Sequence, residues 1–334
     1  MKKRVILISI SLLFVFAAFI AVVFSLYLFR PLGKEGPDQI VVIREGMTLG
    51  DVADILEREG VITHKTLFKL WARILGQSRN IKAGEYQLSA QMTPHRILEI
   101  MTKGIIISHS VTIPEGYSAA QIAELLSQKG LVDKEKFLAL IMDTHAIQQY
   151  GITGPSLEGY IYPDTYQFGR GLSVELIIDT MIKRFWQLVS SYEALVNKSG
   201  MTWNEVVTLA SIVEKETGLA EERPLIASVF LNRLRKRMRL ESDPTVIYGM
   251  ESFNGNLTRK DLKTKTPYNT YVIRGLPPGP IANPGLDAIK AVLNPAQTEY
   301  LYFVSKNDGS HHFSKTLSEH NRAVRIYQKR KKSR

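Results

Sequence analysis

Cysteine is absent from this 334-residue sequence, and its absence excludes disulfides, thiolate nucleophiles and zinc sites with sulfur ligands. Histidine is scarce: the chain has seven, and the adjacent pair His311 and His312 lacks the i, i+4 spacing of a zinc site on a helix. We therefore predict no bound metal and no cofactor. Charged residues make up 22% of the chain and hydrophobic residues 45%, so we expect folded domains rather than disorder.

The net charge of +11 lies mostly at the two ends of the chain. Three basic residues begin the sequence and five close it, which leaves 35 basic against 32 acidic residues in the body. One internal basic cluster remains, between Arg233 and Arg239. We predict no nucleic-acid binding, because no nucleic-acid-binding motif accompanies that cluster. The charge distribution favours an anionic polymer or a membrane surface as the partner.

A run of 25 uncharged residues, Val5–Phe29, follows Lys2, Lys3 and Arg4. As a helix it would be about 37 Å long, enough to cross the ~30 Å hydrocarbon core of a bilayer. A cleaved signal peptide would have a shorter apolar run and a small-residue cleavage site, and the run is too long for a typical buried core helix. We predict a single-pass anchor in the inner (cytoplasmic) membrane, with the N-terminus in the cytoplasm and the body on the outer, periplasmic side.

A repeated pattern follows the anchor. Residues 42–62 return in similar form as residues 112–132. Each copy predicts a strand, a Glu-Gly turn and a helix that starts after Thr48 or Ser118 and ends at a glycine. The first copy, with the helix and strand that follow it, resembles a LysM-like β-α-α-β module, a fold associated with N-acetylglucosamine polymers. The alternative is a duplicated structural unit that only positions the rest of the chain.

We expect an α+β chain with a single N-terminal transmembrane helix, LysM-like β-α-α-β modules and a mixed α/β catalytic domain rich in helices. The predicted segments are a cytoplasmic tip (1–4), the transmembrane anchor (5–29), a linker (30–38), a LysM-like module (39–105), a second repeat-like module (106–190), the catalytic domain (191–328) and a basic tail (329–334). We interpret the basic tail as solvated.

The run Leu209–Thr217 ends an apolar helix in two carboxylates, Glu214 and Glu216. Thr202 and Glu205 have the spacing of a capping box at the start of this helix. Glu216 continues the most apolar stripe, with apolar residues at i−7, i−4 and i−3, whereas Glu214 lies on a less apolar face. Burial raises the pKa of a carboxyl group, and such an acid can protonate the leaving oxygen of a glycosidic bond near neutral pH. We therefore favour Glu216 as the catalytic acid; the alternative is that both glutamates are solvated charges paired with basic neighbours.

Aromatic, hydroxyl and amide side chains gather in proline-rich loops after this helix, at residues 243–248, 268–271 and 275–281. Such groups suit contacts with a sugar, and prolines stiffen loops that lack regular hydrogen bonds. We predict six substrate-binding residues: Asp243, Tyr248, Tyr268, Asn269, Tyr271 and Asn283. A structural role is the alternative for each of them. Further on, residues 301–304 and 311–313 predict the two arms of a β-hairpin.

Several long motifs occur in a fixed order along the chain. They are ASIVEKET (210–217), ASVFLNRL (227–234), MRLESDPTVIYG (238–249), PYNTY (267–271), GLPPGPI (275–281) and NPG (283–285). With the anchor and the LysM-like segment, they resemble the endolytic murein transglycosylases, membrane-anchored lytic enzymes of bacterial peptidoglycan. In that family the second glutamate of the Glu-x-Glu pair is essential, which implies Glu216 here.

The resemblance implies cleavage of the bond between N-acetylmuramic acid and N-acetylglucosamine without water. Glu216 would protonate the glycosidic oxygen and then, as a carboxylate, take the proton of the muramoyl C6 hydroxyl. That hydroxyl would close on C1 and leave a 1,6-anhydro end, so that one carboxyl group serves both steps. The implied partners are nascent peptidoglycan glycan strands, membrane lipid and peptidoglycan synthases.

Two other functions stay open from the sequence. A non-catalytic wall-binding or assembly scaffold would also explain the repeats, the anchor and the basic excess. A lysozyme-type muramidase would need a second carboxylate or a positioned water; Glu158, Asp164 and Asp243 are the candidate carboxylates. The reaction products separate the three, because a scaffold gives none, a hydrolase gives a reducing end and a transglycosylase gives an anhydro end.

Overall fold

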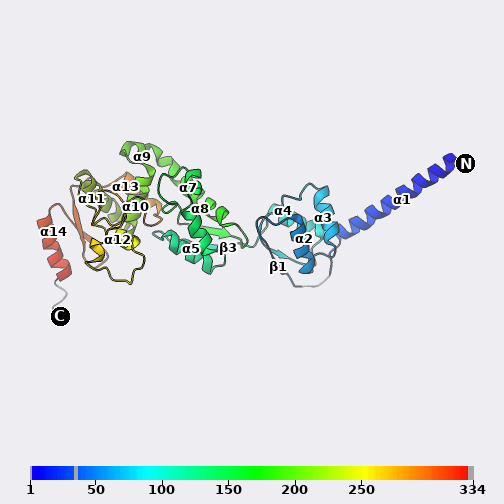
Figure 1. The fold of residues 1–334 in the computed structure, drawn as a ribbon, viewed down its shortest axis with the longest axis horizontal. Coiled ribbons are helices and arrows are strands. Elements are labelled where there is room, and N and C mark those ends of the chain that lie inside the picture. Colours follow the sequence, from blue (N-terminus) through cyan, green and yellow to red (C-terminus); the bar gives the residue numbers. More distant parts are fainter. Residues whose placement is uncertain (1, 34–36, 330–334) are drawn as a thin grey trace. The chain divides into compact units, whose positions relative to one another are not determined.

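The computed structural model describes residues 2–33 and 37–329. Met1, residues 34–36 of the predicted linker and residues 330–334 of the predicted basic tail lie outside the described residues. The chain divides into two compact units, which we call the first unit (Met1–Ser110 with Gln167–Ser173) and the second unit (Val111–Tyr166 with Val174–Arg334). Figure 1 shows the elements of both units, in which short two-stranded sheets stand among many helices. The predicted mixture of helices and strands is confirmed.

The N-terminal helix α1 (Lys2–Phe29) contains the predicted anchor segment. Among the described residues, one stretch is long and apolar enough to cross a membrane, Ile6–Phe29, with a mean hydropathy of 3.0. Its large side chains are exposed; Phe14, for example, is 75% exposed. So much exposed apolar surface favours a non-aqueous surrounding, because water disfavours contact with it.

The body of the first unit has the strand–helix–helix–strand order that the repeat predicts, followed by one further helix. The elements are β1 (Gln39–Ile43), α2 (Leu49–Arg58), α3 (Lys65–Ile74), β2 (Gly84–Leu88) and α4 (Pro94–Lys103). The strands β1 and β2 pair antiparallel, with Val41 opposite Tyr86. Leu56, Phe68 and Met101, one from each helix, are fully buried in the same core as these strands.

The second copy of the repeat forms β3 (His109–Thr112), α5 (Ala119–Gln128), α6 (Lys134–Ile141), α7 (Thr144–Gln149) and β4 (Thr165–Phe168). β3 and β4 pair in a two-stranded sheet, and the division between the units runs through both strands. The rest of the second unit consists of α8 (Val174–Val189), α9 (Glu193–Ser199), α10 (Trp203–Glu216), α11 (Arg223–Arg235), α12 (Asp243–Tyr248), α13 (Leu286–Leu293), β5 (Tyr302–Ser305), β6 (His311–Ser314) and α14 (Leu317–Val324), with short 3-10 or π turns at 190–192, 220–222, 261–263 and 325–329.

The helix starts predicted in the two repeats are confirmed. Thr48 caps α2 and Ser118 caps α5, each in a capping box with the residue three positions later, Asp51 or Gln121. Gly60, just past the end of α2, has a φ of 69°, a conformation that glycine adopts without strain. Local signals of this kind are strong because all the interacting groups are neighbours in the chain.

Helix α10 is enclosed in the second unit, where it packs against α11, α12 and α13. Its predicted start is confirmed, because Thr202 forms a capping box with Glu205. Eight consecutive side chains, at 206–213, are buried. The face that leads to Glu214 is therefore as enclosed as the face that leads to Glu216, and a single apolar stripe does not distinguish the two glutamates.

One segment differs from expectation in its local structure. Residues 243–248, expected as a loop, form the short helix α12. Pro244 lies in its first turn, where the fixed φ of proline suits a helix and the missing N–H is not needed. The hairpin predicted further on is confirmed: β5 and β6 pair antiparallel, with Phe303 opposite Phe313.

Candidate active site

Glu216 is the last residue of α10 and is half-buried. Its Oε1 atom accepts a hydrogen bond of 2.5 Å from the hydroxyl group of Ser242, the residue that precedes α12. Burial raises the pKa of Glu216 to about 7, and the hydrogen bond from Ser242 opposes this rise. The carboxyl group can therefore gain and lose a proton in the neutral range, as a group that acts as both general acid and general base requires.

Glu214, two residues earlier, has fixed partners. Its Oε1 atom accepts a hydrogen bond of 3.0 Å from Arg223, and its Oε2 atom accepts one of 3.0 Å from the backbone N–H of Gly285. The side chain of Arg223 is largely buried, so the ion pair ties α10 to the first turn of α11. Pairing with a basic neighbour, the alternative considered for both glutamates, thus applies to Glu214. The partners of the two carboxylates differ, whereas the burial of their helix faces does not.

A later loop holds Ser242 and α12 in place through Thr270, which is fully buried. The Thr270 hydroxyl accepts a hydrogen bond of 3.0 Å from the backbone N–H of Ser242 and shares one of 2.8 Å with the hydroxyl of Thr245. The neighbouring Tyr271 donates a hydrogen bond of 2.7 Å to Asp243. Burial, followed by that hydrogen bond, raises the pKa of Tyr271, so its hydroxyl keeps its proton. Two predicted sugar-binding residues, Asp243 and Tyr271, are thus brought next to Ser242.

A buried glutamate–histidine pair lies beside the residue that follows α10. Glu222 accepts two hydrogen bonds from His311, one of 2.8 Å from the backbone N–H and one of 2.6 Å involving ring Nδ1. It also accepts a hydrogen bond of 3.4 Å from the hydroxyl of Thr217. His311 and Arg233 favour the charged form of Glu216 and so limit the rise of its pKa. Sequence reasoning missed this pair, whose members are 89 positions apart and carry no motif.

A second buried carboxyl group, Glu158, contacts the far end of α12. It accepts hydrogen bonds of 2.9 and 3.0 Å from the backbone N–H of Ala119, one of 2.8 Å from the amide of Asn283 and one of 3.3 Å from the hydroxyl of Tyr248. Burial raises the pKa of Glu158 to about 7, and these donors oppose the rise. The ring of Tyr248 packs against Tyr268, with ring centroids 4.8 Å apart. Two of the three predicted tyrosines therefore form one aromatic pair.

The two predicted asparagines are fully buried. Asn269 donates its amide N–H groups to three backbone carbonyls within residues 261–264. The Oδ1 atom of Asn283 accepts hydrogen bonds of 2.8 and 3.0 Å from the backbone N–H groups of Gly159 and Ile161. Both amides are engaged within the protein in this conformation, so they support the loops beside α12 and present no free group to a ligand.

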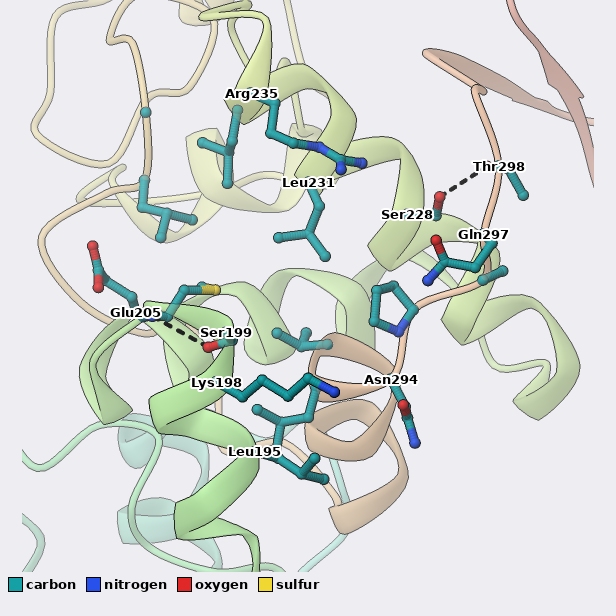
Figure 2. A pocket seen from close by; sticks show the side chains of 18 of the residues that line it. Leu195, Lys198, Ser199, Glu205, Ser228, Leu231, Arg235, Asn294, Gln297 and Thr298 are labelled. Atoms are coloured by element: carbon teal, nitrogen blue, oxygen red, sulfur yellow. Dashed lines mark hydrogen bonds between the residues drawn. The ribbon is translucent and has the colours of Figure 1, made fainter.

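A cavity of about 910 Å³ lies near the other end of α10. Glu205 from the first turn of α10, Lys198 from α9, and Leu231 and Arg235 from α11 are among the residues that line it (Figure 2). Glu205 and Glu216 are eleven positions apart in one helix, which is about 16 Å along the axis. Glu216 therefore lies outside this cavity.

The arrangement around Glu216 is that of an acid–base site. It combines a carboxyl group that titrates near neutrality with hydroxyl and phenol groups that can contact polar ligands such as sugars. In the described ranges, no group of three His, Asp or Glu side chains is placed to hold a metal ion.

The chain belongs to the YceG-like family, whose model matches residues 41–326. It is 34% identical to an endolytic murein transglycosylase of Bacillus subtilis (strain 168), over 90% of this chain and 88% of that protein. It is 32% identical to an endolytic murein transglycosylase of Streptococcus pneumoniae serotype 2, over 85% of this chain and 57% of that protein. A crystal structure of a yceG-like protein of Listeria monocytogenes matches with 37% identity and a TM-score of 0.59, over 85% of this chain and 98% of that chain. The family resemblance seen in the motifs is confirmed, whereas the comparisons do not confirm a LysM-like module.

Proposed function

We propose that this chain is an endolytic lytic transglycosylase that cuts peptidoglycan glycan strands. The observation that carries the proposal is the environment of Glu216, a helix-end carboxyl group with a pKa near 7 and a single hydroxyl group as its hydrogen-bond partner. Two relatives that match most of this chain are named endolytic murein transglycosylases, which supports the same assignment.

The proposed reaction needs one carboxyl group and no water. Glu216 in its acid form donates its proton to the glycosidic oxygen as the bond from that oxygen to C1 of N-acetylmuramic acid breaks. The Glu216 carboxylate then accepts the proton of the C6 hydroxyl group of the same sugar while O6 bonds to C1, which leaves a 1,6-anhydro end. The enzyme recovers its starting protonation state, and a pKa near the working pH serves both half-reactions.

The groups around α12 have proposed roles on the sugar. Asp243 and Tyr271 form a hydrogen-bonded pair next to Ser242, and Tyr248 and Tyr268 offer aromatic faces on which sugar rings can pack. For the two buried asparagines we propose support of these loops in place of direct sugar contact. Ser242 stabilises the carboxylate form of Glu216, the form that must accept the second proton.

Replacing Ser242 by alanine tests the proton chemistry through its pH dependence. The hydrogen bond from Ser242 lowers the pKa of Glu216, so its loss raises that pKa above its value of about 7. Because the first step needs the acid form of Glu216, kcat/KM falls as the pH rises above this pKa. In Ser242→Ala, this alkaline limb of the pH profile of kcat/KM should move to higher pH by about one unit. The exposed Ser190→Ala is the matched control and should leave the profile unchanged. A limb that stays in place or moves to lower pH would show that Ser242 does not tune the reacting group.

We further propose the location and the partners of the enzyme. Helix α1 anchors the chain in the inner membrane, with the basic N-terminal residues in the cytoplasm and the catalytic residues outside. Nascent glycan strands are the proposed substrate, and peptidoglycan synthases are proposed neighbours. The β1–α2–α3–β2 order supports a LysM-like module at 39–105, with a second repeat-like module at 106–190 and the catalytic domain at 191–328.

A lysozyme-type muramidase is the second candidate, and the position of Asp243 is the observation that favours it. Asp243 is exposed, follows Ser242 directly and raises the pKa of Glu216 by its charge. Glu158 and Asp164 fit a second catalytic role less well, because Glu158 is enclosed by donors and Asp164 is paired with Arg184 at 2.7 Å.

The substitution Asp243→Asn separates the two reactions. A hydrolase that uses Asp243 as nucleophile or base should lose about 10³-fold or more in cleavage rate, whereas a transglycosylase that uses it only as a sugar contact should lose about tenfold or less. The measurement is the initial rate of fragment release from uncrosslinked glycan strands by the full-length protein. Asp287→Asn, at an exposed aspartate of α13, is the matched control.

A further inference from the structure

The C-terminal end of α1 is packed against the body of the first unit (Figure 1). The hydroxyl of Tyr27 donates a hydrogen bond of 3.0 Å to the backbone carbonyl of His64, at the start of α3. The ring of Phe29 lies 5.2 Å from that of His95 on α4. Leu28, which lies between Tyr27 and Phe29 in the sequence, is only 2% exposed. The last turn of the membrane-spanning helix is therefore attached to α3 and α4 by side-chain contacts as well as by the chain itself.

Trp71 of α3 extends this attachment into the spanning segment. Its ring lies edge-on to Phe24, with centroids 6.0 Å apart, and its Nε1 donates a hydrogen bond of 3.3 Å to His95. Phe24 is about 7 Å below the end of α1 along the helix axis. A spanning segment of 24 residues is about 36 Å long, some 6 Å more than the hydrocarbon core, so its end reaches into the interfacial layer. Placing this excess at the C-terminal end of α1 puts Trp71 at the boundary between hydrocarbon and headgroups, where tryptophan is enriched.

Helix α3 carries two apolar faces. Phe68 and Ala72 are buried in the core of the first unit. Leu70 and Ile74, one turn apart, lie with Trp71 on a second face. Leu70 and Ile74 are 46% and 60% exposed, whereas Trp71 is partly buried against the core. A folded module that needed only one buried face would not place a second apolar stripe in water, because each such side chain loses free energy there.

We propose that this second face of α3, formed by Leu70, Trp71 and Ile74, is a docking surface for the lipid interface of the membrane that α1 spans. We assign the lipid interface as the occupant because this face is continuous with the spanning helix: Trp71 contacts Phe24 of α1 near the end of the span. Arg73, three positions after Leu70 on the same helix, can reach phosphate groups while its stem covers apolar surface. The inference rests on the proposed anchoring by α1, and it holds the first unit on the membrane surface.

The absence of cysteine allows a direct test. A single cysteine placed at Ile74 in the full-length protein is labelled with an environment-sensitive fluorophore, and the protein is reconstituted in vesicles of phosphatidylcholine and phosphatidylglycerol. Lipids with a nitroxide near the headgroup then quench any label at the interface. Val22→Cys in the span reports insertion of α1, and Ile40→Cys, 62% exposed in β1 of the same unit, is the matched control.

Docking predicts that the fluorescence emission of the label at position 74 is blue-shifted. It also predicts quenching at position 74 roughly twofold or more above that at position 40, because nitroxide quenching requires near contact with lipid. Equal quenching at positions 74 and 40, with a protected label at position 22, overturns the docking surface and leaves the anchor standing. A label at position 22 that is exposed to water overturns the anchor and the docking surface together. Neither result bears on the chemistry of Glu216.

Discussion

Glutamine at position 216 is expected to lower the rate of strand cleavage by about 10³-fold or more while the protein stays folded. Glutamine has nearly the shape of glutamate, but it neither donates a proton to the glycosidic oxygen nor accepts one from the C6 hydroxyl. The measurement is the release of soluble fragments from uncrosslinked glycan strands by full-length protein. Glu221→Gln, at an exposed glutamate just beyond α10, is the matched control and should cleave at the parental rate.

The same substitution should raise stability at alkaline pH, which separates loss of chemistry from loss of fold. The folded chain holds the proton of Glu216 up to a pH of about 7, whereas an unfolded chain releases it near 4.5. The folded state therefore binds more protons between these values, and stability falls as pH rises through that window. Glu216→Gln removes this loss, so it should be about 3 kcal/mol more stable than the parent at pH 8 and nearly equal to it at pH 4. Thermal melts at the two pH values give the comparison.

Replacing Asn283 by alanine should lower the free energy of unfolding of the second unit by about 3–5 kcal/mol and reduce activity as a consequence. The substitution leaves the backbone N–H groups of Gly159 and Ile161 without an acceptor and removes the donor to Glu158, all in buried positions. Urea unfolding followed by tryptophan fluorescence measures the effect. Asn256→Ala, at an exposed asparagine, is the control. A loss below about 1 kcal/mol would mean that Asn283 does not support the loops and would return it to the candidates for sugar contact.

Elements with local signals were predictable from the sequence. The caps at Thr48, Ser118 and Thr202 depend on residues three positions away, and the strand–helix–helix–strand order of the repeat follows from periodicity within short windows. The helix α12 was not predicted, because aromatic and hydroxyl residues around Pro244 suit a loop as well as a helix start. Its helical state depends on Thr270, which bonds Ser242 and Thr245 from a distant loop.

The candidate site was predictable in its residue types and not in its contacts. Glu216 was singled out by a helix-face argument, yet the structure encloses both faces of α10, and the ion pair of Glu214 with Arg223 is what separates the two carboxylates. Ser242 and the pair formed by Glu222 and His311 reach the site from other elements, and one sequence does not reveal such pairings. Asn283 has the side chain of a sugar contact, but its burial and hydrogen bonds depend on tertiary packing.

The chemistry of the new chain ends tests the central claim most directly. Uncrosslinked glycan strands are incubated with the full-length protein, and the products are analysed by mass spectrometry beside those from Glu216→Gln. The proposal predicts fragments that end in 1,6-anhydro-N-acetylmuramic acid, one water lighter than hydrolysis products, and none from the variant. Reducing ends in their place would contradict the transglycosylase and favour the muramidase. An absence of products from the folded parent protein would favour the scaffold.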